Sequence, residues 1–370
     1  MHQVNSKKLL IAGGGTGGHV LAGIAVADAW KVHWGDLGQV FFVGAFGGLE
    51  EKLVPQAGYP LTLLKLGSLN RVSWKRKLKT LGQLPFCFFR CMRILLTLRP
   101  QTVLGVGGYA SGPVVWVARF LRFFRLIKVH IAILEQNAVP GLTNRLLGFS
   151  VDIVLAGFPG LDCFFPKKRV IVTGNPIRNT LERMPISPVT QDKPFTVFIF
   201  GGSQGSFGMN TLVLEALEHL GELRGSLQWI HQTGEKDFNR VLEGYKKARI
   251  QARVEKFIQD MPQMYRECHL VICRAGASTL AEIATVGRAA ILIPLPTAAN
   301  NHQEENARVY SDAGAAHLLL QEKASGQQLA LLMKDLVSHP QKREKMEQKL
   351  SVFQNSDAAM NVVNALSLVL

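Results

Sequence analysis

The sequence predicts an α/β protein built from two doubly wound domains, each with a parallel sheet. Its 370 residues exceed what one hydrophobic core usually organises, and 47% of them are apolar. Short β-rich apolar runs alternate with glycine clusters and helical patterns, which is typical of a parallel sheet with crossover helices. A proline-rich stretch interrupts this alternation, which then restarts. The restart predicts a second domain of the same kind.

The predicted strands follow the same order in both halves. In the first half the clearest apolar runs are residues 9–12, 40–43, 102–105 and 130–134. In the second half they are residues 195–200, 228–232, 269–273 and 290–294. Pro185, Pro188 and Pro194 separate the two sets. We therefore predict an N-terminal domain over 1–180, a linker over 181–194 and a second domain over 195–345. The final stretch, 346–370, has a helical pattern and is expected to pack back on the first domain.

Composition excludes several classes of protein. The five cysteines are odd in number and form no CxxC pair, so neither a disulfide framework nor a zinc site is predicted, and they indicate a reducing compartment. The apolar run after Lys7 and Lys8 enters glycines too soon for a secretory signal. Arg, Lys, Gly or Pro breaks every apolar stretch before it is long enough to span a bilayer. A soluble or peripheral protein is expected.

The net charge of +15 is concentrated in one segment. The stretch between Glu51 and Glu135 has no acidic residue and holds 14 of the 42 lysines and arginines, so elsewhere 28 basic residues face 27 acidic ones. Aromatic residues such as Trp74, Phe86 and Phe123 are interleaved with these charges. The segment predicts contact with an anionic surface, and the alternative is a solvated face over core aromatics.

Three glycine-rich segments carry the functional signal: residues 13–19, 105–113 and 201–206. Each follows a predicted strand and opens a helix, so its backbone N–H groups and helix N-terminus suit an anion. The first also satisfies GxGxxG, which by itself can be an ordinary tight turn. A dinucleotide site needs an acidic residue after the next strand, where Gly44-Ala45-Phe46 stands instead. The repeated pattern therefore predicts a diphosphate ligand.

A fourth junction, residues 273–279, precedes a helix that carries Glu282. A carboxylate one turn inside this helix is able to accept hydrogen bonds from ribose hydroxyls while the helix N-terminus faces phosphate. The alternative is an ordinary solvated glutamate.

Nine segments together resemble the MurG family, bacterial transferases that add GlcNAc from UDP-GlcNAc to undecaprenyl-diphosphoryl-MurNAc-pentapeptide. The resemblance covers nearly the whole chain. The segments are GGTGGHV (14–20), GLEEKLVPQAGY (48–59), GVGGYASGP (105–113), EQN (135–137), TGNPIR (173–178), GGSQG (201–205), FIQDM (257–261), CRAGAST (273–279) and HQEENA (302–307).

The resemblance implies a GT-B architecture, in which two Rossmann-like domains face a cleft and the second domain holds most of the donor. It places Ile258 on uracil through its backbone, Glu282 on ribose and Gln303 on the GlcNAc hydroxyls. The remaining donor-binding residues that it implies are Thr16, Gly17, Gly18, Asn137, Arg178, Ser203, Ala277, Ser278, Thr279, Leu280 and Ala281. The first two glycine loops would face the acceptor diphosphate, the second of them through Gly107, Gly108, Tyr109 and Ser111.

The implied reaction is attack of the MurNAc C4 hydroxyl on the anomeric carbon of UDP-GlcNAc, with inversion and release of UDP, a step of peptidoglycan synthesis. His19 is the candidate base because the ordinary pKa of histidine lies near neutrality, although it equally suits a structural role in the loop. Glu135 is the second candidate. Arg178 or Arg274 would assist the departing diphosphate. The chain has no DxD motif, so we expect metal-independent turnover without a cofactor.

Four positions depart from the family pattern. Leu134 stands where the family has a histidine before EQN, Ala22 replaces a proline, Ala275 a serine and Asn301 an aspartate. Leu134 has no acid–base capacity. These departures affect single contacts.

The basic segment is interpreted as a membrane contact because the implied acceptor is a polyprenyl lipid and anionic leaflets attract Lys and Arg. The residues proposed for this contact are Arg71, Trp74, Lys75, Arg76, Lys77 and Lys79. The expected location is the cytoplasmic face of the bacterial inner membrane, as a peripheral protein. The main rival is a UDP-sugar-dependent diacylglycerol glycosyltransferase. A nucleic-acid binder leaves the glycine loops unexplained, and an NAD-dependent oxidoreductase lacks its acidic residue.

Overall fold

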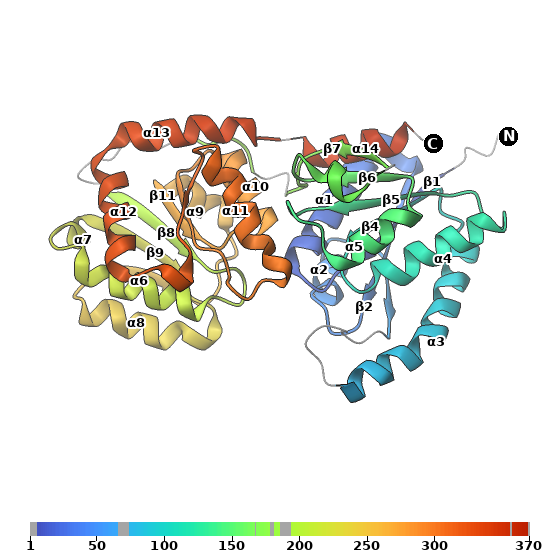
Figure 1. Cartoon of the computed structure of the whole chain (residues 1–370), viewed down its shortest axis with the longest axis horizontal. Helices are drawn as coiled ribbons and strands as arrows, with labels where there is room; N and C mark the ends of the chain where they lie inside the picture. Colours follow the sequence, from blue (N-terminus) through green and yellow to red (C-terminus); the bar gives the residue numbers. More distant parts are fainter. Residues whose placement is uncertain are drawn as a thin grey trace. The chain divides into compact units, whose positions relative to one another are not determined.

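The computed structural model describes residues 6–65, 74–166, 168–177, 181–185, 194–355 and 357–368, with the backbone only for 74–84 and 299. The chain forms two compact units (Figure 1). The first comprises Met1–Arg178 and Asp357–Leu370, and the second comprises Asn179–Ser356. None of the helices in these described segments is both long and apolar enough to cross a membrane.

The first unit contains a seven-stranded parallel sheet in the order β3-β2-β1-β4-β5-β6-β7. Its strands are β1 (Lys7–Gly13), β2 (Gly38–Ala45), β3 (Leu61–Leu64), β4 (Thr102–Gly107), β5 (His130–Glu135), β6 (Ile153–Ala156) and β7 (Arg169–Val172). Its helices are α1 (Gly17–Trp34), α2 (Glu50–Gln56), α3 (Trp74–Leu98), α4 (Ser111–Phe123), α5 (Leu142–Leu147) and α14 (Ala358–Ser367).

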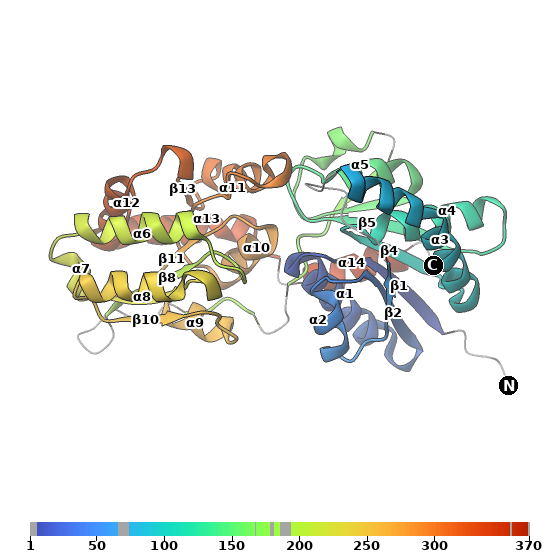
Figure 2. The ribbon, with the colours of Figure 1, turned by 90° about the horizontal axis from the view of Figure 1, so that it is seen from below.

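The second unit contains a six-stranded parallel sheet in the order β10-β9-β8-β11-β12-β13 (Figure 2). Its strands are β8 (Phe195–Phe200), β9 (Leu227–Gln232), β10 (Ala252–Glu255), β11 (Leu270–Cys273), β12 (Ala290–Leu292) and β13 (His317–Leu318). Its helices are α6 (Phe207–His219), α7 (Leu223–Ser226), α8 (Phe238–Lys247), α9 (Met261–Glu267), α10 (Ala277–Val286), α11 (His302–Asp312), α12 (Gly326–Ser338) and α13 (Pro340–Lys349).

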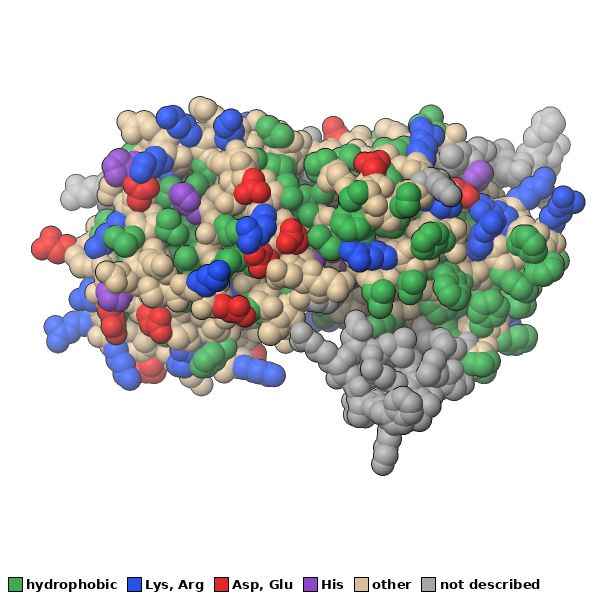
Figure 3. Space-filling view, in the orientation of Figure 1, with side chains coloured by type: hydrophobic (Ala, Val, Ile, Leu, Met, Phe, Trp, Pro, Cys, Tyr) green, Lys and Arg blue, Asp and Glu red, His purple; other side chains and the backbone are tan. Residues whose placement is uncertain are grey.

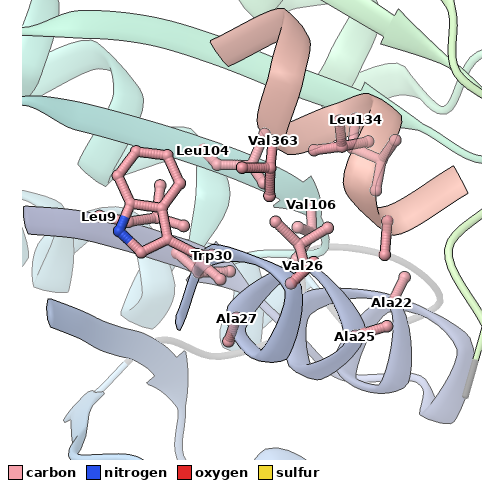
Figure 4. Close-up of a cluster of buried hydrophobic side chains, with 14 of the residues drawn as sticks. Leu9, Ala22, Ala25, Val26, Ala27, Trp30, Leu104, Val106, Leu134 and Val363 are labelled. Atoms are coloured by element: carbon pink, nitrogen blue, oxygen red, sulfur yellow. The ribbon is translucent and has the colours of Figure 1, made fainter. Parts of the chain in front are cut away.

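The first sheet is buried on both faces, which explains why its strands are continuous apolar runs rather than alternating ones. Successive side chains of a strand point to opposite faces. Leu9 and Ile11 therefore join one hydrophobic cluster, whereas Leu10 and Ala12 join another. The first cluster includes side chains from α1 and α14, and Figure 4 shows Val363 of α14 beside Val26 and Val106.

The predicted fold class, two doubly wound parallel-sheet domains, is confirmed. The chain returns to the first unit at Asp357, so residues 346–356, which the helical pattern groups with the C-terminal helix, belong to the second unit. Strands β3, β6, β7, β10 and β13 are not among those predicted from the sequence. They lie at or next to sheet edges and have two to four residues, too few to show a period.

Each sheet has one point where the strand order reverses, and this point positions the glycine loops. In the first sheet β1 lies between β2 and β4, so the chain leaves β1 in one direction and β4 in the other. In the second sheet β8 and β11 have the same relationship. Ligands of open α/β sheets bind at the carboxyl ends of such strands. The first and second glycine loops follow β1 and β4, and the third loop and fourth junction follow β8 and β11.

Candidate functional site

The first and second glycine loops contact each other through their backbones. The Gly14 N–H donates to the Gly107 carbonyl at 3.2 Å. Gly108 has φ +82°, and a Cβ at this position would lie 2.3 Å from the Gly14 carbonyl oxygen. Only glycine fits there. The sequence pattern suggests that these glycines allow a diphosphate to approach closely. At Gly108, however, contact with the first loop is by itself enough to require a glycine.

A buried carboxylate supports the first loop. Glu50, at the start of α2, is 1% exposed and accepts hydrogen bonds from the Gly15 N–H at 2.8 Å and the Ala45 N–H at 3.0 Å. The sequence does not mark this residue as functional. The only signal is its place in the GLEEKLVPQAGY segment, which does not tell Glu50 from the adjacent Glu51. The structure shows that Glu50 connects the loop after β1 to the end of β2.

We expect Glu50→Ala to lower the free energy of unfolding of the protein by about 1–3 kcal/mol, since it leaves the buried Ala45 N–H without a partner, whereas water can reach the exposed Gly15. Urea denaturation measures the change. The matched control is Glu51→Ala, because Glu51 is exposed and accepts one hydrogen bond, from the Gly47 N–H. This control should change stability by less than about 1 kcal/mol. Equal effects from the two variants would contradict the supporting role of Glu50.

His19 lies in the first turn of α1, beside both glycine loops. Its Nδ1 is 2.9 Å from the Thr16 hydroxyl. A Cβ on Gly107 would lie 2.8 Å from His19 Nε2, so this edge of the imidazole lies against the second loop. The Gln136 side chain, at the end of β5, donates to the Gly18 carbonyl at 3.3 Å. The structure thus brings together Thr16, His19 and the second loop at the switch point of the first sheet.

Glu135, the second candidate base, is enclosed by the protein. Its carboxylate is 2% exposed and accepts hydrogen bonds from the Asn137 N–H at 2.9 Å, the Gly141 N–H at 3.1 Å and the Asn144 amide at 2.9 Å. Burial raises the pKa of Glu135, and these hydrogen bonds oppose the rise. A general base must reach the hydroxyl whose proton it takes. The structure therefore shows Glu135 ordering the segment that carries Asn137, and a role as base stays a prediction.

Ser111 also acts inside the protein. Its fully buried hydroxyl donates to the Ala12 carbonyl at 2.6 Å and accepts from the Gly107 N–H at 3.1 Å. These bonds tie the start of α4 to β1 and to the end of β4. Ser111 is expected to contact an acceptor diphosphate, but its hydroxyl is not exposed in this structure. Tyr109 and Gly108 in the same loop are half-buried.

In the second unit, helix α10 presents an uncapped N-terminus. Its N-cap residue is Gly276, which has no side chain to accept from the first-turn N–H groups. Such a terminus suits an anion. Ser278 and Thr279 are half-buried in this turn, whereas Ala277 and Leu280 are buried. Ser203 is exposed in the third loop, which follows the neighbouring strand β8. The third loop and the α10 N-terminus therefore lie at one switch point.

Arg274, one of two arginines expected to assist the departing diphosphate, is enclosed by the protein, and that role stays a prediction. It is 7% exposed, and its two terminal amino groups donate to the Ile293 and Pro294 carbonyls, to Gln321 and to the Ser206 hydroxyl. Burial lowers the pKa of Arg274 to about 10, which leaves the group charged at neutral pH. This guanidinium joins the third loop to the fourth junction from inside.

The Ile258 N–H, which the resemblance places on uracil, has a partner in the protein. It donates to Gln232 Oε1 at 2.7 Å, and Gln232 Nε2 donates to the Gly202 carbonyl at 3.0 Å. Gln232 is buried at the carboxyl end of β9. This amide therefore joins the third glycine loop to the segment around Ile258, a role that no sequence motif indicates. The proposed backbone contact between Ile258 and uracil stays a prediction.

Glu282 and Gln303 each accept a hydrogen bond from a neighbouring residue. The hydroxyl of Tyr265, on α9, donates to Glu282 Oε2 at 3.0 Å. The Leu295 N–H donates to Gln303 Oε1 at 3.0 Å. The turn before Gln303 contains Asn300 and Asn301, both left-handed at φ 52° and 55°, a conformation that asparagine tolerates better than most residues. Asn301, which stands in place of the family's aspartate, donates to Glu304 at 2.7 Å.

Several predicted residues lie outside the described part of the chain. Arg71 and Arg178 are not described, and for Trp74, Lys75, Arg76, Lys77 and Lys79 the structure places only the backbone of α3. Within the described residues, no three His, Cys, Asp or Glu side chains are grouped so as to hold a metal ion.

Comparison with known proteins identifies the family. Residues 9–156 match the profile of the glycosyltransferase family 28 N-terminal domain, and residues 196–362 match that of its C-terminal domain. The chain belongs to glycosyltransferase family 28. The residues at the switch point of each sheet are therefore the candidate active-site residues of a family 28 glycosyltransferase.

Family 28 relatives match the chain over nearly its whole length. The UDP-N-acetylglucosamine–N-acetylmuramyl-(pentapeptide) pyrophosphoryl-undecaprenol N-acetylglucosamine transferase of Myxococcus xanthus is 43% identical over 96% of this chain and 91% of its own. The transferase of the same name from a Geobacter species is 41% identical over 97% of this chain and 95% of its own. The crystal structure of Acinetobacter baumannii MurG superposes with a TM-score of 0.77 at 31% identity, covering 98% of this chain and 99% of that chain. The resemblance to the MurG family is confirmed.

Proposed function

We propose that the protein transfers GlcNAc from UDP-GlcNAc to the C4 hydroxyl of undecaprenyl-diphosphoryl-MurNAc-pentapeptide, with inversion, in peptidoglycan synthesis. The names of the relatives describe a GlcNAc transfer of this kind for those proteins. The observation that carries the proposal is the switch point of the second sheet. There an uncapped helix N-terminus, suited to a diphosphate, lies one turn from a carboxylate that Tyr265 orients.

In this proposal the second unit holds the donor. The α10 N-terminus and Ser203 bind the diphosphate, and Glu282 accepts from the ribose hydroxyls. Arg178, which lies outside the described residues, stays a predicted donor contact. The Ile258 backbone meets uracil, where the carbonyl is suited to the N3–H of the base because Gln232 engages the N–H. Gln303 uses its carbonyl oxygen on Leu295, so a GlcNAc hydroxyl would meet its amino group.

The first unit supplies the acceptor site and the base. The MurNAc C4 oxygen forms a bond to the anomeric carbon, the bond from that carbon to the diphosphate oxygen breaks, and its electron pair leaves with UDP. The proton of the C4 hydroxyl passes to His19, whose other nitrogen contacts Thr16. Gly107, Gly108 and Tyr109 face the acceptor diphosphate, and Thr16 to Gly18 with Asn137 also reach the donor.

We further propose that the protein works as a peripheral enzyme on the cytoplasmic face of the bacterial inner membrane. Ten apolar side chains of the first unit are 41% to 79% exposed: Phe86, Phe89, Trp116, Phe120, Phe123, Phe124, Leu126, Leu142, Leu146 and Phe149. They lie on or just after α3, α4 and α5. We call this set the apolar face.

Ring contacts connect the α3 and α4 parts of the apolar face, and exposed cations lie on or just after the same helices. The rings of Phe88 and Phe120 are 5.9 Å apart and those of Phe120 and Phe124 4.7 Å apart, which links α3 to α4. Exposed basic side chains on these elements include Arg93, Arg119, Arg125, Lys128 and Arg145. Figure 3 shows green and blue side chains intermixed over this part of the first unit. Aromatic side chains ringed by Lys and Arg fit an anionic lipid surface.

The activity is tested with labelled UDP-GlcNAc and a short-chain analogue of the polyprenyl-diphosphate acceptor. We expect transfer with release of one UDP per product and no loss of rate in EDTA, because the chain has no DxD motif to hold a metal-bound diphosphate. A parallel reaction offers diacylglycerol, the acceptor of the rival glycolipid transferase. Transfer to diacylglycerol alone would contradict the acceptor assignment. Loss of activity in EDTA that magnesium restores would contradict metal independence.

A further inference from the structure

We infer that Tyr265 is a positioning residue for Glu282 and thereby sets how strongly the enzyme prefers ribonucleotides over 2′-deoxyribonucleotides. The inference rests on the proposed function, in which Glu282 accepts from the ribose hydroxyls. Nothing in the sequence singles out Tyr265. Its place emerges from the contact between α9 and α10, two helices that follow different strands of the sheet.

The contact joins a buried donor to a half-buried acceptor. Tyr265 has no exposed surface, and its hydroxyl lies 3.0 Å from Glu282 Oε2. Glu282 itself is half-buried on α10, the helix whose uncapped N-terminus suits the diphosphate. A carboxylate offers about four lone-pair positions, so a phenol at one of them is compatible with ribose hydroxyls at others.

Tyr265 is held from several directions, so the position of its hydroxyl is well defined. Its ring packs edge-on against Phe198 and Phe200 of β8, with centroids 5.8 and 6.2 Å away. Its carbonyl accepts a hydrogen bond at 2.9 Å from Nε of Arg288, which is fully buried. Close-packed interiors leave such a side chain little room to move.

The protonation states of Tyr265 and Glu282 favour an arrangement in which the phenol donates to the carboxylate. Burial, together with the nearby charge of Glu282, raises the pKa of Tyr265 well above its usual range, so the phenol stays a neutral donor. A long glutamate side chain loses rotamer freedom when it binds a ligand. Because Tyr265 holds the carboxylate beforehand, the ribose meets an acceptor whose orientation is already set. The benefit applies to ligands that donate to Glu282.

The test compares UDP with 2′-deoxy-UDP, which lacks one ribose donor, by calorimetric titration of the full-length protein. The variants are Tyr265→Phe, Glu282→Ala and the double variant. The matched control is Tyr245→Phe, which removes a fully buried hydroxyl that contacts His231 instead of Glu282. The measured quantity is the ratio of the two dissociation constants, which does not depend on the fraction of folded protein.

We expect the wild-type protein to prefer UDP by about tenfold, as for one hydrogen bond to a charged group. Glu282→Ala should remove the preference, and Tyr265→Phe should reduce it to about threefold, part of that same contribution. In the double variant Tyr265→Phe should have no further effect, because the group that it positions is gone. Tyr245→Phe should leave the ratio unchanged.

The contrary outcomes separate the inference from the proposed function. If Glu282→Ala keeps the full preference, Glu282 does not bind the ribose, and both the ribose assignment and the positioning role of Tyr265 fail, while the transfer assay still tests the activity. If Glu282→Ala removes the preference while Tyr265→Phe keeps it, the ribose assignment stands and the positioning role is wrong. A lower melting temperature in Tyr265→Phe with an unchanged ratio also contradicts the positioning role, because it describes a tyrosine that only stabilises the core.

Discussion

Replacing His19 with alanine is expected to lower kcat by about 100-fold to 10,000-fold, the usual contribution of a positioned general base. His19 is a titratable side chain at the switch point of the first sheet, where Thr16 contacts one edge of the imidazole and the second glycine loop the other. The rate is measured with saturating UDP-GlcNAc and a soluble lipid acceptor. Because His19 is proposed to act on the acceptor hydroxyl, the affinity for UDP should change by less than about threefold.

Glu135→Gln is the comparison variant for this prediction. Glutamine keeps the size of the Glu135 side chain, which orders the segment that carries Asn137. We expect a loss of kcat of about tenfold, smaller than for His19→Ala, because this segment is displaced. If Glu135→Gln is the more damaging of the two while its melting temperature is unchanged, the base assignment passes to Glu135. If His19→Ala keeps more than about a tenth of the wild-type kcat, His19 is a structural residue of the loop.

Replacing four phenylalanines of the apolar face with serine is expected to weaken binding to anionic phospholipid vesicles by about 100-fold or more, on an area basis. The four are Phe86, Phe89, Phe123 and Phe124, which are 56% to 70% exposed. Since these side chains are largely in water, their removal should cost little stability. Vesicle sedimentation measures the binding, and UDP affinity should not change, because the donor site is proposed to lie in the second unit.

Two further variants show whether the effect is specific to this face. Leu331 and Val352, in the second unit, are 58% and 76% exposed, and their replacement by serine should leave vesicle binding unchanged. Glutamine at Arg71, Lys75, Arg76, Lys77 and Lys79 should weaken binding most at low salt, where electrostatic attraction is strongest. Unchanged vesicle binding in both the serine and the glutamine variants would contradict the proposed membrane contact.

Local sequence patterns are sufficient to predict the architecture. Strands such as 9–12 and 195–200 are apolar runs bounded by glycine or proline, and these features depend on neighbours along the chain. The same holds for the places of the four junctions, since a glycine cluster between a strand and a helix is visible in any one segment. Short edge strands such as β13 escape prediction because two residues carry no pattern.

Side-chain roles are predicted less well, because burial is decided by residues far along the chain. Glu50 and Glu51 are chemically identical in the sequence, yet only Glu50 accepts from Gly15 and Ala45. Arg274 looks available for a diphosphate in the sequence, but its donors meet carbonyls of the segment after β12 and the side chain of Gln321. Ser111 and Glu135 are likewise occupied by partners inside the fold.

The sequence by itself determined the two parallel-sheet domains, the four junctions between strand and helix, and the family to which the chain belongs. Tertiary structure alone decided which junctions meet, because the order of strands in each sheet places β1 beside β4 and β8 beside β11. It also decided which polar side chains face inward, and so assigned Glu50, Gln232 and Tyr265 to supporting roles. The physical reason is that backbone propensity acts over a few residues, whereas burial and hydrogen-bond partners depend on packing between distant segments.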